Sequence, residues 1–144
     1  MPWYLIIKSL YEYLKAANVA DVLIIGIPEA GSIVLDEEKT VLYLARVEES
    51  ELNIYHGGEG QATIELGFFT ASQDPDMSKG YEILNNVELK TQKVLEEWAA
   101  QAVPVEGMDT MRIRIGAAGG NPYVERPVIG SFIDLQVDWS LRTQ

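Results

Sequence analysis

The 144-residue chain contains no cysteine, which excludes disulfide bonds and thiolate metal sites. Long apolar runs are also lacking. The longest clean run covers residues 22–25, whereas a helix that crosses a membrane needs about 20 apolar residues. The N-terminal residues show no small-residue cleavage site of the kind that ends a secretory signal. We therefore expect a protein made in the cytoplasm and without a membrane anchor.

Basic residues are scarce, with 11 lysines and arginines against 22 acidic residues and a net charge of −11. The imbalance is local, because residues 21–76 contain 12 acidic and 2 basic residues. Nucleic-acid binding depends on cations that displace counterions from phosphates. The composition therefore disfavours sequence-specific binding of nucleic acid. The acidic residues either keep the protein soluble or form a functional acidic surface, and both interpretations stay open.

Signatures of catalysis and metal binding are missing. His56 is the single histidine, and it lies in a glycine-flanked segment among glutamates. Zinc would require about three or four nitrogen or sulfur ligands, and the alternating acids of a calcium loop are absent. Gly26 and Gly31 lack the Gly-Lys-Ser/Thr ending of a phosphate loop, and there is no Gly-x-Ser-x-Gly elbow. We expect no catalytic residue, no metal and no cofactor.

The 47% content of hydrophobic residues is enough for an ordinary core, and the length favours a single domain over residues 1–144. Apolar residues at three- and four-residue spacing predict a helix over residues 3–17, with Asn18 as a left-handed C-cap. The same spacing predicts a helix over residues 78–102, opened by Asp or Ser caps and ended by Pro104.

Strands are predicted where apolar and polar residues alternate or where short apolar runs occur. The expected strands cover residues 21–26, 40–47, 61–70, 110–117 and 127–143. We expect the first of these to be buried, the second to be covered on both faces, and the last to lie inside the sheet. In the fourth, Met111, Ile113 and Ile115 should point inward. Residues 48–60 and 116–127 are read as a long acidic loop and a glycine-rich loop.

The element order is therefore α-β-β-β-α-β-β. Consecutive strands with short connections favour antiparallel pairing, and the apolar stripes of two helices must be buried against the sheet. We predict an α+β fold of two layers. It has a mostly antiparallel sheet of about four to five strands, with both helices on one face.

Two groups of residues stand out as candidates for contact with a partner, because they place apolar or long side chains within the expected loops. They are Leu52, Ile54 and Tyr55 in the acidic loop, and Tyr123, Val124 and Arg126 in the glycine-rich loop. The alternative is that the tips of these loops fold back onto the domain. Sequence alone leaves both possibilities open.

The layout resembles the tail terminator, or tail completion, proteins of long-tailed phages and prophages. The features that carry the resemblance are WYLIIKSLYEYL at the start, the strand–loop–strand of residues 40–70, the helix over residues 78–102 and the ending FIDLQVDWSLRT. Together they cover nearly the whole chain. The resemblance rests on the order and length of the elements, and no signature motif contributes to it.

The resemblance implies a non-enzymatic structural protein that assembles with itself as a ring, which in that family is usually a hexamer. Such a ring caps the head-proximal end of the tail tube, stops tube growth and contacts the head-completion proteins. It implies a location in the host cytoplasm during assembly, and in the virion tail if the phage is active. Another head–tail joining or minor tail protein is the nearest alternative. A small-molecule-binding domain or an enzyme of bacterial metabolism is the alternative from another class.

Overall fold

The structure is a computed structural model that describes residues 3–29, 36–53, 58–101, 103–121, 124 and 126–141. Residues 51–53, 109 and 110 are described through their backbone alone. The elements are α1 (Trp3–Ala17), β1 (Val22–Ile25), β2 (Thr40–Asn53), β3 (Glu59–Ala71), α2 (Ser78–Ala99), β4 (Met108–Gly120) and β5 (Val128–Leu141). This confirms the predicted order of two helices and five strands.

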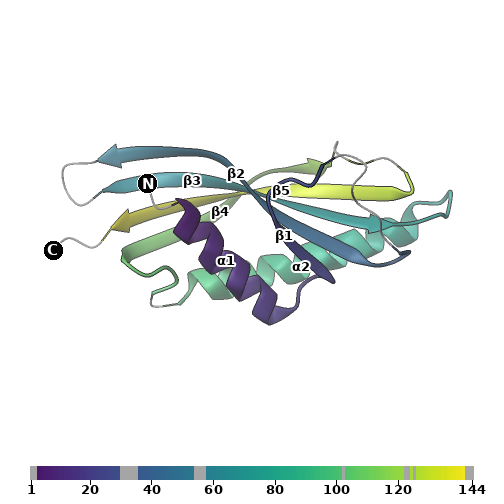
Figure 1. The fold of residues 1–144 in the computed structure, drawn as a ribbon, viewed down its shortest axis with the longest axis horizontal. Helices are drawn as coiled ribbons and strands as arrows, with labels where there is room; N and C mark the ends of the chain where they lie inside the picture. Colours follow the sequence, from purple (N-terminus) through teal and green to yellow (C-terminus); the bar gives the residue numbers. More distant parts are fainter. Residues whose placement is uncertain are drawn as a thin grey trace.

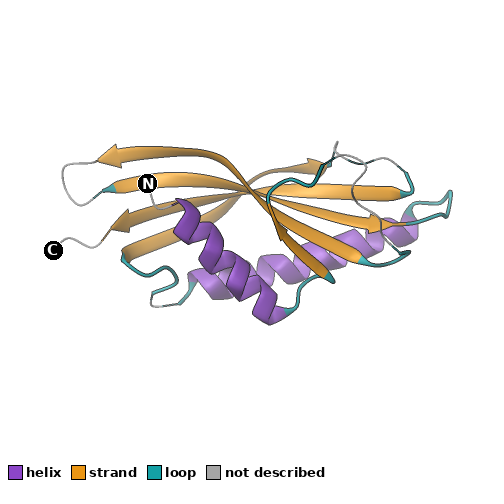
Figure 2. Cartoon of the chain, viewed as in Figure 1, coloured by secondary structure: helices purple, strands orange, loops and turns teal. Residues whose placement is uncertain are grey.

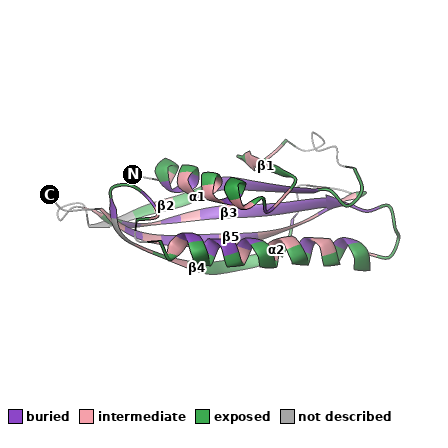
Figure 3. Ribbon diagram, turned by 90° about the horizontal axis from the view of Figure 1, so that it is seen from below, coloured by how far each residue is buried: buried purple, intermediate pink, exposed green. Residues whose placement is uncertain are grey.

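The five strands form one sheet in the order β1-β2-β3-β5-β4. β1 runs parallel to β2, and the other neighbouring pairs are antiparallel. Both helices lie below the sheet in the ribbon views (Figure 1, Figure 2) and in front of it when it is seen from below (Figure 3). The predicted two-layer α+β fold is confirmed. We call the face beneath the helices the helix face and the opposite one the open face.

The closing strand β5 lies inside the sheet, as its long alternation predicted, between β3 and β4. Its alternate apolar side chains Ile133, Leu135, Val137 and Trp139 are all buried on the helix face. Burial on one face and hydrogen bonding to two neighbours make this strand the centre of the domain.

The main core lies between the helices and the sheet. It takes Ile6, Ile7, Leu10 and Leu14 from α1, and Leu84, Val94, Leu95 and Trp98 from α2. Trp98 and Trp139 both belong to this core. The indole of Trp98 donates a hydrogen bond of 3.0 Å to Ser9 Oγ, and the Ser9 hydroxyl donates one of 2.6 Å to the Pro104 carbonyl. The indole N–H is therefore satisfied inside the core.

The helix ends agree with the sequence in part. Asn18 has φ of 53° and donates to the Lys15 carbonyl, so the predicted left-handed cap of α1 is confirmed. α2 ends at Ala99, three residues earlier than predicted, and Pro104 lies five residues beyond its end. The proline is therefore not what ends the helix. A tighter turn ends it, in which Gln101 N–H donates to the Trp98 carbonyl.

Both middle strands are longer than predicted. The expected acidic loop of residues 48–60 is largely strand, because β2 continues to Asn53 and β3 begins at Glu59. Cross-strand pairing holds the acidic residues extended, with Glu48 opposite Thr63 and Glu51 opposite Gly60. Low intrinsic strand propensity is overridden here by a partner strand of matching length.

The other differences concern the edges of the sheet. β1 was expected to be buried, but it is an edge strand whose Val22 and Ile25 are exposed. β4 extends to Gly120, so the glycine-rich connection begins only there. Ile115 was expected to point inward. It lies on the helix face, where the helices leave it 43% exposed.

A smaller apolar cluster lies on the open face. It consists of Val41, Tyr43, Ala45 and Phe69, with Ile24, Val124 and Val128 against it. The residues between them on β2, Leu42 and Leu44, belong to the main core. The prediction that this part of β2 is covered on both faces is therefore confirmed for residues 41–45. Val47 lies at a β-bulge and is exposed.

Candidate interaction surface on the open face and the sheet edges

Polar and charged side chains collect on the open face, beside the small apolar cluster. Register places there Glu48 of β2, Thr63 and Glu65 of β3, Asp134, Gln136 and Asp138 of β5, and Arg112 and Arg114 of β4. On β3, β4 and β5 these residues alternate with the side chains of the helix face, and on β2 the bulge at Val47 brings Glu48 to the open face. Both described helices lie on the opposite side of the sheet (Figure 1).

Tyr43 links the apolar and polar parts of the open face. It is fully buried, although no helix lies above it. Its hydroxyl donates to Glu65 Oε2 at 2.6 Å and accepts from Asn121 Nδ2 at 3.0 Å. The ring contacts Phe69 with a centroid distance of 5.5 Å. These contacts fix the Glu65 carboxylate at the border between the two regions.

Two carboxylates face each other across the sheet next to this tyrosine. Glu65 and Asp134 are direct partners in the register of β3 and β5. Partial burial raises the pKa of Asp134 above its ordinary value of 3.8, and repulsion by the Glu65 carboxylate raises it further. The Tyr43 hydroxyl donates to Glu65, and Asp134, its neighbour across the sheet, is the carboxylate with the raised pKa.

Charges of opposite sign lie at opposite edges of the sheet. Arg112 and Arg114 project from β4, and Glu48 projects from β2. All three are exposed, and none makes a hydrogen bond or ion pair with another described residue. Glu49 differs, because its carboxylate accepts from Arg46 Nε at 2.6 Å, and that guanidinium lies 4.0 Å from the centre of the Trp3 ring.

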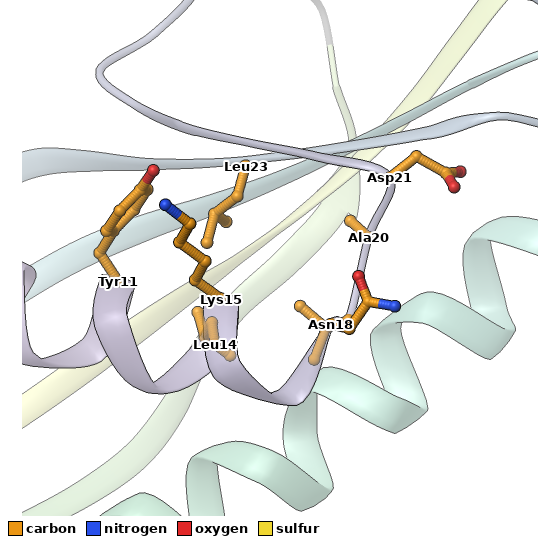
Figure 4. A pocket seen from close by; sticks show the side chains of 8 residues that line it. Tyr11, Leu14, Lys15, Asn18, Ala20, Asp21 and Leu23 are labelled. Carbon is orange, nitrogen blue, oxygen red and sulfur yellow. The ribbon is translucent and has the colours of Figure 1, made fainter.

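Two hollows of the described surface, one where α1 turns into β1 and one between α2 and β4, show no converging set of charged groups. The first, of about 290 Å³, lies where α1 turns into β1 (Figure 4). Lys15 and Tyr11 point into it from α1, whereas the Asp21 carboxylate turns away and accepts from the Thr40 backbone at 2.9 Å. A binding pocket for a small polar ligand would bring such groups together.

A second, larger hollow of about 500 Å³ runs between α2 and the glycine-rich end of β4. It is lined by Tyr81, Leu84, Asn85, Glu88, Ala118, Gly119, Gly120, Gly130 and Ser131. Its floor consists of small residues, because β4 and β5 carry glycine, alanine and serine there. Its polar side chains are Tyr81, Asn85 and Glu88 of α2 and Ser131 of β5, and Glu88 is the single charged group among them.

The structure describes three of the six residues that the sequence singles out as partner contacts. Leu52 lies in β2, so its assignment to a loop is wrong. Val124 is half-buried against the open-face cluster. Ile54, Tyr55 and Tyr123 lie outside the described residues. A role of these side chains in binding a partner stays a prediction.

Arg126 is exposed but makes contacts within the chain. Its Nη2 donates to the carbonyl of Asp74 at 2.6 Å and to that of Ser72 at 3.5 Å, and Nη1 contacts Met77 Sδ. The guanidinium therefore ties the segment before β5 to the turn that opens α2. This arrangement positions the β4–β5 connection beside the N-terminus of α2.

Reasoning from sequence missed the sheet edges as a candidate surface. One signal was available: no glycine or proline interrupts the chain from Thr40 to Asn53, which is compatible with a longer strand. Arg112 and Arg114 are exposed, in agreement with the inward parity predicted for Met111 and Ile113. Their strand is the outermost one because β5 lies between β3 and β4. The alternation of β5 predicted an interior strand, but it did not predict which strands are its neighbours.

His56 lies outside the described residues, and the described ones contain no group of three potential metal ligands. Neither α1 nor α2 has the length and apolarity that crossing a membrane requires. No protein-family model matches the chain, and no curated protein matches it in sequence.

Proposed function

We propose that this chain is a non-enzymatic structural subunit of a phage or prophage tail. In this role it is a tail terminator that forms a ring on the head-proximal end of the tail tube and joins it to the head-completion proteins. The proposal starts from the order and length of the elements, which resemble that family. Its partners are other copies of itself, the tail tube and the head-side connector.

One observation carries the proposal. The described charged groups of the sheet are spread over the open face and its two edges and do not converge in a hollow. Extended surfaces of this kind suit contacts between protein subunits, whereas small ligands require concave sites with converging polar groups. The excess of acidic residues also supports it, because a ring through which DNA passes should repel the duplex.

Electron microscopy tests this function directly. The purified protein is imaged alone and after mixing with tail tubes of the phage or prophage that encodes it. We expect rings at one end of each tube, and tubes assembled in its presence should stop growing.

Ile54→Asp and Tyr123→Asp, in the two candidate segments, should prevent binding without lowering the melting temperature. Tubes that remain uncapped and keep growing would reject the terminator. A particle that binds heads and leaves tube length unchanged would favour the joining protein.

A further inference from the structure

Register places Glu48 and Arg114 at the two ends of one row across the sheet. Glu48 lies opposite Thr63, Thr63 lies opposite Gln136, and Gln136 lies opposite Arg114. Residues that are paired in register project to the same face, so all four side chains lie on the open face. One edge of the sheet therefore ends in a carboxylate and the other in a guanidinium, at the same height along the strands.

The adjacent row repeats the arrangement with a smaller polar group. Ser50 lies opposite Gln61, Gln61 lies opposite Asp138, and Asp138 lies opposite Arg112. The side chain of Arg112 therefore lies one row away from Arg114, on the same face of β4. Two guanidinium groups on the β4 edge correspond to one carboxylate and one hydroxyl on the β2 edge.

Apolar side chains also correspond at the two edges. Ile115, at the outer strand β4, is 43% exposed, and its row runs through Leu135 and Ile64 to Arg46. Val47 follows Arg46 at a bulge of β2 and is 51% exposed. An exposed branched apolar residue therefore lies at both ends of this part of the sheet, next to the charged row.

Among the described residues, no strand pairs with the outer side of β4 or with the distal half of β2. β1 covers the outer side of β2 only from Val41 to Leu44, and β4 is the last strand of the sheet. At the left-hand end of the sheet in Figure 1, β2 and β4 are the outermost strands. Unpaired N–H and C=O groups on an edge strand are a template for pairing with another chain.

We propose that β4 of one copy pairs with the distal half of β2, residues 45–53, of a second copy. β2, β3, β5 and β4 alternate in direction, so β4 runs antiparallel to β2. Two copies placed side by side without a shift along the strands set Arg114 beside Glu48, Arg112 beside Ser50 and Ile115 near Val47. Bulges on both strands limit regular pairing to residues 48–51 of β2 and 110–115 of β4.

The two edges differ, so the contact is head-to-tail and leaves one free edge of each kind on every pair of copies. Repeated contacts of this kind form a ring if the rotation from each copy to the next leads back to the first copy, and a filament if it does not. The inference deepens the proposed function and rests on it for closure into a ring. The pairing itself is a property of the isolated chain and is tested without any tail component.

Charge reversal at the two ends of the row provides the test, with association measured by sedimentation velocity. Glu48→Lys alone and Arg114→Glu alone should each raise the dissociation constant by at least about tenfold, because like charges meet at every contact. A 1:1 mixture of the two variants should associate again, since every contact between unlike copies is then complementary. The chain that carries both substitutions should also regain association.

Glu82→Lys and Lys93→Glu are the matched controls, because they make the same charge changes at exposed positions of α2. They should leave association unchanged, and thermal melts confirm that every variant folds. The pairing is overturned if the wild-type chain is a monomer at its highest soluble concentration and associates only with another protein. It is equally overturned if it associates but the mixture of reversed variants does no better than either alone.

The outcomes separate this inference from the proposed function. Rings that cap tail tubes and persist in both single variants would keep the function and reject the pairing. A wild-type chain that associates through the complementary pair but never binds a tube would keep the pairing and reject the function.

Discussion

The ring of Tyr43 lies against the backbone of Gly67 on the neighbouring strand, so closely that a Cβ at position 67 would be 2.0 Å from Tyr43 Cε1. The two residues are partners in the register of β2 and β3. Absence of a side chain at Gly67 is what allows the tyrosine to lie flat on the open face and to reach Glu65. This contact takes the place of a covering helix at that point of the sheet.

Gly67→Ala should therefore destabilise the protein. The new methyl group would overlap the Tyr43 ring, and the ring can escape only by losing its hydrogen bonds to Glu65 and Asn121. Overpacking of this kind costs about 1–3 kcal/mol of unfolding free energy, occasionally more. Urea denaturation of the two proteins measures the difference.

Gly116→Ala is the matched control for that experiment. Gly116 also lies in a strand, but a Cβ there would come no closer than 3.6 Å to any atom, which is ordinary contact. Its unfolding free energy should be within about 0.5 kcal/mol of the wild type. If Gly67→Ala and Gly116→Ala changed the unfolding free energy equally, the position of the Tyr43 ring would not depend on the absence of a side chain at Gly67.

Trp139→Ala should be among the most damaging substitutions in the chain. The indole is buried on the helix face of β5 and lies over Gly60, where a Cβ would be 2.4 Å from Trp139 Cζ2. Removing a buried tryptophan costs about 3–5 kcal/mol. Tyr81→Ala, at an exposed position of α2, should change stability little. A thermal melt in which Trp139→Ala loses only a degree or two would reject the packing described above.

Sequence predicted the fold because most elements carry their own pattern. The stripe of α1 and the alternation of β5 are strictly periodic, and the burial of Leu10 and Leu135 follows from those periods. The asparagine at the end of α1 is one of the few residues that accept a left-handed conformation. At these places the local sequence pattern is sufficient to predict the structure.

The unpredicted features depend on contacts between distant segments. Glu48 and Glu49 lie in a strand because β3 is long enough to pair with them, which their own propensities oppose. Ile115 follows the inward parity of its strand, but α2 does not extend over it. The candidate surface on the edges depends on strand order, so no local pattern in the sequence contains it.

Asp134 should make stability depend on pH in a direction opposite to that of most carboxylates. Its pKa is raised, so the charged form is disfavoured in the folded state. Protonation of Asp134 therefore favours folding, and this contribution is lost as pH rises from about 3.8 through the raised pKa. An asparagine at position 134 is uncharged at every pH, so the Asp134→Asn variant does not lose this stability as the pH rises. Its melting temperature should exceed that of the wild type at pH 7 and approach it near pH 3.8 and below.

Asp76→Ala is the informative comparison, because the pKa of Asp76 is shifted the other way. Hydrogen bonds from the Ser78 hydroxyl and backbone N–H lower that pKa. The stability that these bonds contribute is present above the ordinary value and lost as pH falls through the lowered pKa. Asp76→Ala should therefore melt below the wild type at pH 7, and the difference should shrink in acid. Parallel pH profiles of the two variants would contradict both assignments.

Substitution of Arg126 tests whether its side chain stabilises the fold or binds a partner. Its guanidinium donates to the carbonyls of Asp74 and Ser72, and a lysine cannot reproduce both bonds with one ammonium group. Exposure reduces the value of such bonds, so Arg126→Ala should cost about 1 kcal/mol and Arg126→Lys nearly as much. Arg112→Ala, which removes an arginine without a bonded partner among the described residues, should leave the melting temperature unchanged. If Arg126→Ala instead melts like the wild type and fails to associate, the arginine acts at an interface between subunits.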